Sequence, residues 1–233
     1  MSFLLVHGAG MAASCWDRLL PLLTGPTIAV DLPGRGKRSD RDIRGVTLDD
    51  CAAAIVEDAA DLTDIVMVAH SFAGVSVPRV LPELADRIEH VVFLSAVVPP
   101  HGTRVLDQID PAVRTAVRQS IVGGVYHQDR AAAIAMLCND MSPEQAEWTA
   151  DQVIDDSAAL LEETVDLSGL SADLPRTYVR LTEDACYPPD LQSRSADLVG
   201  GSTRFLESGH MPMVSMPGEL AALLDQVRKQ IPS

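Results

Sequence analysis

Short apolar runs alternate with longer helical patterns along most of this chain of 233 residues, and this alternation restricts the fold more than any other feature. The runs are rich in Val, Ile and Leu, which is typical of strands buried on both faces of a sheet. They cover residues 3–6, 27–30, 65–69, 91–95, 177–181 and 203–206. Strands that alternate with helices predict an α/β fold, here with a six-stranded, mainly parallel sheet flanked by helices.

Helical patterns fill most of the gaps between these runs. They cover residues 14–23, 47–62, 72–84, 189–198 and 217–230. The second has a clear beginning, because Thr47 can cap it while Asp49 and Asp50 lie in its first turn, near the positive end of the helix dipole.

One long stretch interrupts the alternation after the fourth strand. About 80 residues between residues 95 and 177 contain no convincing strand pattern, and helical segments are expected near 105–120, 129–137, 143–154 and 158–165. Ser142 followed by Pro143 is a well-formed helix start. We therefore predict a helical cap at residues 102–174, inserted into a core formed by residues 1–101 and 175–233.

The charge and the cysteines exclude several classes of protein. Lys and Arg number 18 against 33 Asp and Glu, a formal net charge of −15. Nucleic-acid binders carry a basic surface and anionic membranes repel acidic chains, so we expect neither partner. The four cysteines form no C-x-x-C pair, and no signal peptide or long apolar run is evident. We expect a cytoplasmic protein with reduced thiols and with no metal or organic cofactor; a homodimer is neither required nor forbidden by the charge.

The most informative segment runs from Val66 to Val75, where an apolar strand is followed by a turn at Ser71 and then by a helix. Ala69 and Ala73 lie two positions on either side of Ser71, and a strained strand-to-helix turn requires small residues there. The segment resembles the nucleophile elbow G-x-S-x-G of α/β-hydrolases, with two alanines in place of the usual glycines. It predicts Ser71 as a nucleophile; the alternative is a serine that caps the following helix.

A second segment, Val6-His7-Gly8-Ala9, ends the first strand and resembles the H-G-x loop of the same fold. In that fold the loop supplies one donor of the oxyanion hole. The backbone N–H groups of Ala9 and of Phe72 would then converge on a carbonyl oxygen. An ordinary glycine turn is the alternative.

A serine nucleophile needs a base, and the base needs an acid that orients it. Of the six histidines, only His210 follows the last strand, where the order Ser…Asp…His places the base; the alternative is an exposed loop histidine. Asp184 follows the strand at 177–181 and is the predicted acid, with Glu183 as the alternative. No acid follows the strand at 91–95, where some hydrolases keep theirs.

The glycine-rich segment Gly34-Arg35-Gly36-Lys37-Arg38 lacks the spacing of a phosphate-binding loop. We expect it to form the turn after the second strand, with its Arg and Lys side chains solvated. Asp31, directly before it, is expected to stabilise that turn.

The chain as a whole resembles the plant-type methylesterase and hydroxynitrile lyase branch of the α/β-hydrolases, together with its bacterial esterase relatives. The most specific matches are Thr182-Glu183-Asp184 and the tail Gly209-His210-Met211-Pro212-Met213. Further matches are 6–9 with Trp16, 20–23, 29–32, 70–71, 92–94, 142–144 and 188–192. The resemblance implies a six-stranded core with a helical cap over the active site. The lyases place a hydroxyl or amide side chain where this chain has Gly8, and the (S)-type lyases a lysine where it has Met211, so cyanohydrin cleavage is not expected.

These observations predict a serine hydrolase that cleaves small or medium apolar carboxylic esters through Ser71, His210 and Asp184. Two alternatives remain open. One is a non-hydrolytic enzyme with the same residues, such as a cyclase, lyase or acyltransferase of a biosynthetic pathway. The other is a ligand-binding protein that uses the hydrolase pocket as a receptor. The sequence does not identify the acyl or alcohol part of the substrate.

Overall fold

A six-stranded parallel sheet forms the centre of the computed structural model, which describes residues 1–231 except the side chain of residue 112. The strand order is β2-β1-β3-β4-β8-β9, and every neighbouring pair is parallel. The bounds are β1 Ser2–Val6, β2 Thr27–Val30, β3 Ile65–His70, β4 Ile88–Leu94, β8 Arg176–Leu181 and β9 Ser202–Leu206. The predicted α/β sheet is confirmed, although β4 begins earlier than residue 91.

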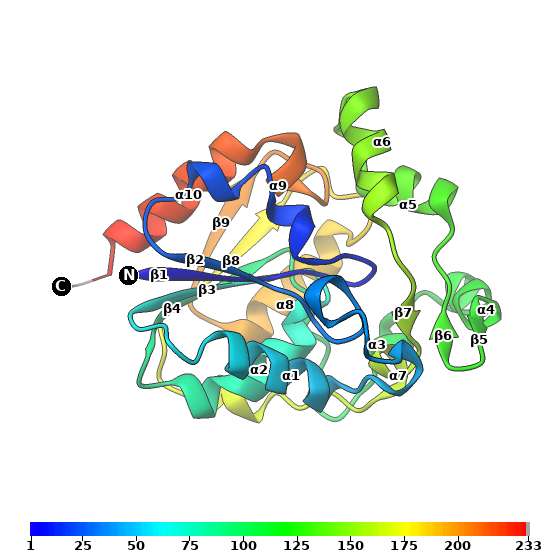
Figure 1. The fold of residues 1–233 in the computed structure, drawn as a ribbon, viewed down its shortest axis with the longest axis horizontal. Coiled ribbons are helices and arrows are strands. Elements are labelled where there is room, and N and C mark those ends of the chain that lie inside the picture. Colours follow the sequence, from blue (N-terminus) through cyan, green and yellow to red (C-terminus); the bar gives the residue numbers. More distant parts are fainter. Residues whose placement is uncertain (232–233) are drawn as a thin grey trace.

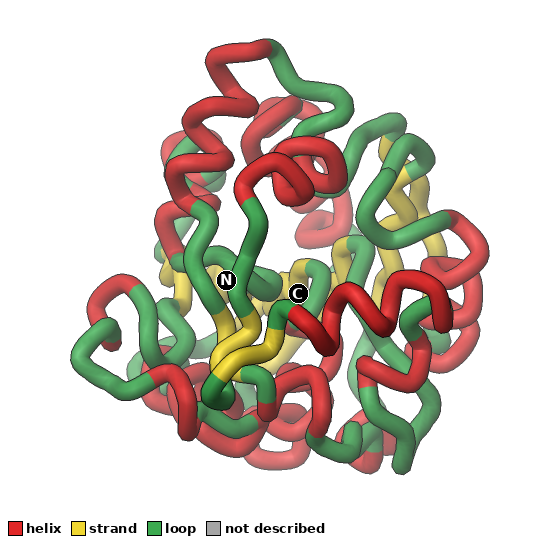
Figure 2. The backbone as a smooth tube through the Cα atoms, turned by 90° about the vertical axis from the view of Figure 1, so that its right-hand side faces the viewer, coloured by secondary structure: helices red, strands yellow, loops and turns green. Residues whose placement is uncertain are grey.

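Helices cover both faces of the sheet, and Figure 2 shows them in red on both sides of the yellow strands. Below the sheet in Figure 1 lie α1 (Leu48–Asp58) and α2 (Ala73–Leu84), and above it α9 (Pro212–Ser215) and α10 (Pro217–Lys229). Alternate side chains of β1 therefore enter two separate cores: Leu4 packs with the α1 and α2 side, and Leu5 with the α10 side. Burial on both faces explains the continuous apolar runs of these strands.

The first expected helix, at residues 14–23, is wrong in detail. The chain forms two short 3-10 helices there, η1 (Ala13–Trp16) and η2 (Leu20–Leu22). Pro21 has no N–H and cannot donate to a carbonyl four residues earlier, which disfavours a continuous α-helix in this short segment. The expected start of α1 is confirmed, because the Thr47 hydroxyl accepts from Asp50 N and the Asp50 carboxylate accepts from Thr47 N.

Residues 102–174, here called the insertion, separate β4 from β8 in sequence. Its elements are α3 Val105–Gln108, α4 Pro111–Gln119, β5 Ile121–Val122, β6 Val125–Tyr126, α5 Arg130–Leu137, α6 Pro143–Gln152, β7 Asp156–Ser157, α7 Ala159–Glu162 and η5 Ser168–Ser171. The expectation of helices alone is wrong here, because β5, β6 and β7 form a small antiparallel sheet. These strands are too short to show an alternating pattern. A Gly123-Gly124 turn, with positive φ at both residues, joins the first two.

The remaining helix, α8 (Pro189–Val199), follows β8 and packs against it. Its residue Gln192 is fully buried and makes hydrogen bonds to both backbone groups of Leu181, at the end of β8. These bonds fix the point at which the chain leaves the sheet, just before Thr182-Glu183-Asp184.

Candidate active site

Ser71 lies directly after β3 in the left-handed region of the backbone, with φ of 52°. This conformation is costly for a residue with a side chain, and it occurs preferentially at functional turns. The Ser71 carbonyl accepts hydrogen bonds from Gly74 N at 3.1 Å and Val97 N at 2.8 Å, which hold the turn. A Cβ atom at Gly74 would lie 2.4 Å from the Val97 carbonyl oxygen. The elbow therefore needs a glycine at position 74, three residues after the serine, where the usual motif has its glycine two residues after it.

His210 joins Ser71 to Asp184 through its two ring nitrogens. Its Nε2 lies 2.9 Å from Ser71 Oγ, and its Nδ1 lies 2.7 Å from Asp184 Oδ2. In the neutral tautomer that fits both contacts, Nδ1–H donates to the carboxylate and the serine hydroxyl donates to Nε2. The structure thus brings together the predicted nucleophile, base and acid. Glu183, the alternative acid, has an exposed side chain, whereas Asp184 is buried.

The Asp184 carboxylate accepts four hydrogen bonds from the protein. Oδ2 accepts from Ser95 Oγ at 2.7 Å and from His210, while Oδ1 accepts from the backbone N–H groups of Cys186 and Tyr187. Burial opposes ionisation of this carboxyl group, but His210 and these donors hold its pKa below its usual value. Asp184 is therefore an anion beside the imidazole.

Opposing effects also act on the pKa of His210. Burial of the ring lowers it, but the neighbouring Cys186 and Asp184 side chains outweigh burial and hold the pKa well above 6.5. His70 lies next to it, with ring centroids 4.8 Å apart, and its Nε2–H donates to the His210 carbonyl at 2.9 Å. Burial and the neighbouring His210 lower the His70 pKa to about 3, so this second histidine stays neutral and supports the first.

The loop after β1 is held by His7. Its Nδ1 lies 2.8 Å from the Gly8 carbonyl, and its Nε2 accepts from Leu32 N at 3.3 Å. Burial and the charge of Arg35 lower the His7 pKa to about 3, so the neutral ring donates through Nδ1. A Cβ atom at Gly8 would lie 2.7 Å from Ser71 Cβ, so only glycine lets the loop approach the serine. Within residues 1–231, neither Ala9 N nor Phe72 N has an acceptor.

Two consecutive residues of the insertion hold the loops that carry the acid and the base. Asn139 Nδ2 donates to the carbonyl of Glu183 at 2.8 Å, directly before Asp184. Asp140 Oδ2 accepts from Gly209 N at 2.8 Å, directly before His210, and from Ser208 Oγ. Sequence analysis missed both residues, because they are about 40 and 70 positions from their partners and belong to no recognisable motif.

The turn after β2 differs from expectation at its two arginines, since the Arg38 side chain is only 17% exposed and pairs with Asp58. Asp31 does stabilise it, since its carboxylate accepts from Ala13 N and Lys37 N, each within 3.0 Å. Arg35, however, is not solvated: its guanidinium is buried and forms an ion pair with Asp156 of β7. The prediction was wrong because the partner lies 121 positions away in the chain, and only the folded insertion brings its carboxylate to this turn.

An apolar cavity of about 360 Å³ adjoins the site. Val97, which donates to the Ser71 carbonyl, and Cys186, which donates to Asp184, form part of its wall. The remaining wall is mostly aliphatic and comes from the insertion, from the loop between β8 and α8, and from α8 itself: Val105, Gln108, Ile109, Asp110, Val113, Met136, Ala185, Tyr187, Pro188 and Leu191.

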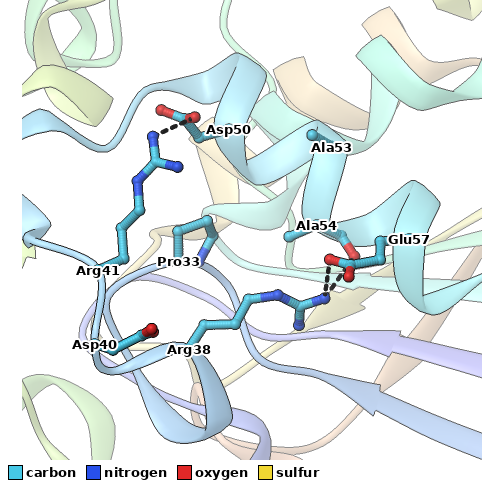
Figure 3. Close-up of a pocket in the computed structure, with 8 residues that line it drawn as sticks. All are labelled: Pro33, Arg38, Asp40, Arg41, Asp50, Ala53, Ala54 and Glu57. Atoms are coloured by element: carbon cyan, nitrogen blue, oxygen red, sulfur yellow. Dashed lines mark hydrogen bonds and ion pairs between the residues drawn. The ribbon is translucent and has the colours of Figure 1, made fainter.

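A different hollow, of about 230 Å³, lies between the turn after β2 and α1 and is drawn in Figure 3. Its two arginines both have carboxylate partners: Arg38 pairs with Glu57 and Arg41 with Asp50. Their charges are neutralised locally, and none of the predicted site residues lines this hollow. Its features do not indicate a phosphate site.

Two features are absent from residues 1–231. No group of three or more His, Cys, Asp and Glu side chains within that range is arranged to hold a metal ion. Within the same range, no helix is long and apolar enough to cross a membrane.

The parallel sheet, the strained serine after β3 and the histidine and aspartate after the last two strands define an α/β-hydrolase fold. The chain belongs to the alpha/beta hydrolase family, whose sequence profile matches residues 3–223.

Known proteins similar over the whole length agree with this assignment. A carbendazim hydrolyzing esterase from Nocardioides sp. is 27% identical over 96% of this chain and 98% of its own. Norfluorocurarine synthase 2 from Strychnos nux-vomica is 27% identical over 98% of this chain and 96% of its own. An extracellular alpha/beta-hydrolase from a Paenibacillus species, described as homologous to tobacco salicylic acid binding protein 2, has the same fold, with a TM-score of 0.88, 24% identity and coverage of 97% and 98%.

Proposed function

We propose that this protein is a serine hydrolase that cleaves small or medium apolar carboxylic esters through an acyl-enzyme. The observation that carries the proposal is that His210 accepts a hydrogen bond of 2.9 Å from Ser71 and donates one of 2.7 Å to Asp184. These distances are within the range required of a nucleophile, its base and the group that orients the base.

In the proposed reaction, His210 Nε2 takes the proton of Ser71 as Oγ attacks the ester carbonyl. The N–H groups of Ala9 and Phe72 donate to the oxygen that becomes negatively charged, and Asp184 stabilises the imidazolium. The C–O bond to the alcohol then breaks, and His210 returns its proton to the leaving oxygen. Water, deprotonated by His210, attacks the acyl-enzyme and releases the acid.

The proposed base must be neutral to accept the serine proton. Because the His210 pKa is raised well above 6.5, kcat/KM should rise with pH through that region rather than near the ordinary histidine value. Replacing Asp184 with Asn should move this acidic limb to lower pH and reduce the rate at the same time.

The apolar wall of the 360 Å³ cavity supports an apolar substrate. A cavity of this size lies in the range of small-molecule sites, and half of the residues in its wall come from the insertion. We therefore propose that the insertion serves as a cap that selects the substrate. The relatives named esterase support the choice of ester hydrolysis over other reactions of the same residues.

The test is hydrolysis of p-nitrophenyl esters from acetate to octanoate by the wild type and by Ser71→Ala. We expect turnover by the wild type, a loss of about 10⁴-fold or more in the variant, and an acyl adduct on Ser71 by mass spectrometry. Thermal unfolding of both proteins checks that the variant is folded. Equal rates in the two proteins would remove Ser71 from the mechanism.

A non-hydrolytic reaction of the same residues is the second candidate, because norfluorocurarine synthases 1 and 2 are among the relatives. The product distinguishes the two, since hydrolysis in ¹⁸O-labelled water places one label in the released acid. If a folded wild type turns over no ester but binds a ligand tightly, the receptor alternative is favoured instead.

A further inference from the structure

The buried ion pair between Arg35 and Asp156 joins the core to the insertion beside the loop that follows β1. Each residue is only 2% exposed, and the guanidinium lies against both carboxylate oxygens. Arg35 also donates to the Met11 carbonyl at 3.4 Å. A buried carboxylate is stable only when its charge is compensated, so Arg35 is what allows an acidic side chain at this position.

Asp156 also binds the loop directly. Its Oδ2 accepts from Gly10 N at 2.8 Å, and the nearby Ile154 N donates to the Gly10 carbonyl at 3.0 Å. Both backbone groups of Gly10 are thus held by the insertion. In Figure 1 the loop after β1 reaches the segment between α6 and β7, which agrees with these bonds.

The adjoining residue, Ala9, lies between two anchored peptide groups. The peptide before it is held at the Gly8 carbonyl by His7 Nδ1, at 2.8 Å. The peptide after it is held at Gly10 N by Asp156. A planar trans peptide fixes the direction of its N–H once its carbonyl is fixed, and the second anchor prevents the Ala9 backbone from rotating away.

We propose that Asp156, paired with Arg35, is a positioning residue that holds the N–H of Ala9 in the direction needed to stabilise the oxyanion. The proposal rests on the proposed esterase function. It makes the insertion a part of the catalytic arrangement in addition to a wall of the substrate cavity.

The test uses two double variants that both remove the buried cation. R35M/D156L replaces the pair with apolar side chains, which proteins often tolerate without loss of stability, and leaves Gly10 N–H without an acceptor. R35M/D156N keeps a neutral acceptor there. R130M, which breaks an exposed ion pair of the insertion between Arg130 and Glu147, is the control.

We expect R35M/D156L to lower kcat by about tenfold or more, less than the ~10²–10³-fold loss typical of removing an oxyanion donor outright. Its KM should stay within about twofold, and binding of phenylboronic acid, which forms a tetrahedral adduct with the serine, should weaken in parallel with kcat. R35M/D156N should recover most of both losses, and R130M should match the wild type. A folded R35M/D156L with wild-type kcat and boronate affinity overturns the proposal.

Amide hydrogen exchange at Gly10 separates this proposal from the proposed function. If the wild type hydrolyses no ester, the proposed function fails, and exchange still reports on the anchor. Faster exchange at Gly10 in R35M/D156L than in R35M/D156N, by about tenfold or more, supports the anchor. Equal exchange in the two variants overturns it.

Discussion

The hydroxyl of Ser95 donates a hydrogen bond of 2.7 Å to Asp184, on the same carboxylate oxygen that accepts from His210. Ser95 follows β4 and Asp184 follows β8, and these two strands are neighbours in the sheet. The ends of β4 and β8 are thus two positions from which an acidic side chain could reach His210. This chain has its acid after β8 and a fully buried serine after β4.

This geometry predicts that the acid can be moved from one strand to the other. Asp184→Ser should lower kcat by about 10⁴-fold, as loss of the orienting acid does in other serine hydrolases. Adding Ser95→Asp should restore about tenfold or more of that loss, because the new carboxylate lies beside the position of the old one. Steady-state kinetics measures both, with Ser95→Ala as control. A folded double variant no faster than Asp184→Ser would show that the two positions are not equivalent.

Asp140 should influence the rate through the His210 loop. Asp140→Ala leaves Gly209 N–H without its acceptor, and a buried unpaired donor costs about 1–3 kcal/mol of unfolding free energy. We expect kcat to fall by about tenfold, with a shift in the acidic limb of the pH profile because His210 is held less firmly. Asp140→Asn keeps one acceptor oxygen and should behave nearly as the wild type. Urea unfolding and the pH profile check this, and an unchanged profile in Asp140→Ala would contradict it.

Gly8 should tolerate no side chain at all. The Cβ atom of Gly8→Ala would lie 2.7 Å from Ser71 Cβ, so either the serine or the loop has to move. Since a misplacement of about 1 Å can cost about 10²-fold in rate, we expect a large loss of kcat. Gly218→Ala in α10 is the matched control, because its Cβ would contact nothing within 4 Å. Wild-type kcat in Gly8→Ala would show that the approach of this loop to the serine is unimportant.

The neutral buried histidines predict a loss of stability in acid. His70 has its pKa lowered to about 3, so the native state binds fewer protons than the unfolded state as pH falls below about 6.5, and stability decreases. Between pH 6.5 and pH 5 one such residue costs about 2 kcal/mol. The raised pKa of His210 acts in the opposite direction: its contribution is present below pH 6.5 and is lost as pH rises through the folded pKa.

Urea unfolding of the wild type and of His70→Gln at pH 7.5 and pH 5.0 tests this prediction. The drop in unfolding free energy between the two pH values should be about 2 kcal/mol smaller in the variant, because glutamine cannot take up the proton. An equal drop in both proteins would mean that His70 is not the group that titrates.

The sequence predicted the parts of the site that depend on local pattern. Ser71 was found from the small residues around it, and Asp184 and His210 from their places after the last two strands. What it could not predict depends on contacts between distant segments. Ser95, Asp140 and the buried Arg35–Asp156 pair lie 68 to 121 positions from their partners, and nothing in their neighbours indicates those contacts. The small sheet of the insertion was missed because two-residue strands have no period, although the Gly123-Gly124 turn was a usable signal.

The order of the site residues along the chain has a consequence for synthesis of the protein. The loop with Gly8 follows β1 and the elbow with Ser71 follows β3, whereas His210 follows β9, with only α9 and α10 after it among the described elements. A ribosome therefore exposes the serine, its turn and its surrounding sheet long before the imidazole that would take its proton. Until that imidazole emerges the proposed nucleophile has no base, so the appearance of activity should report completion of the sheet at β9.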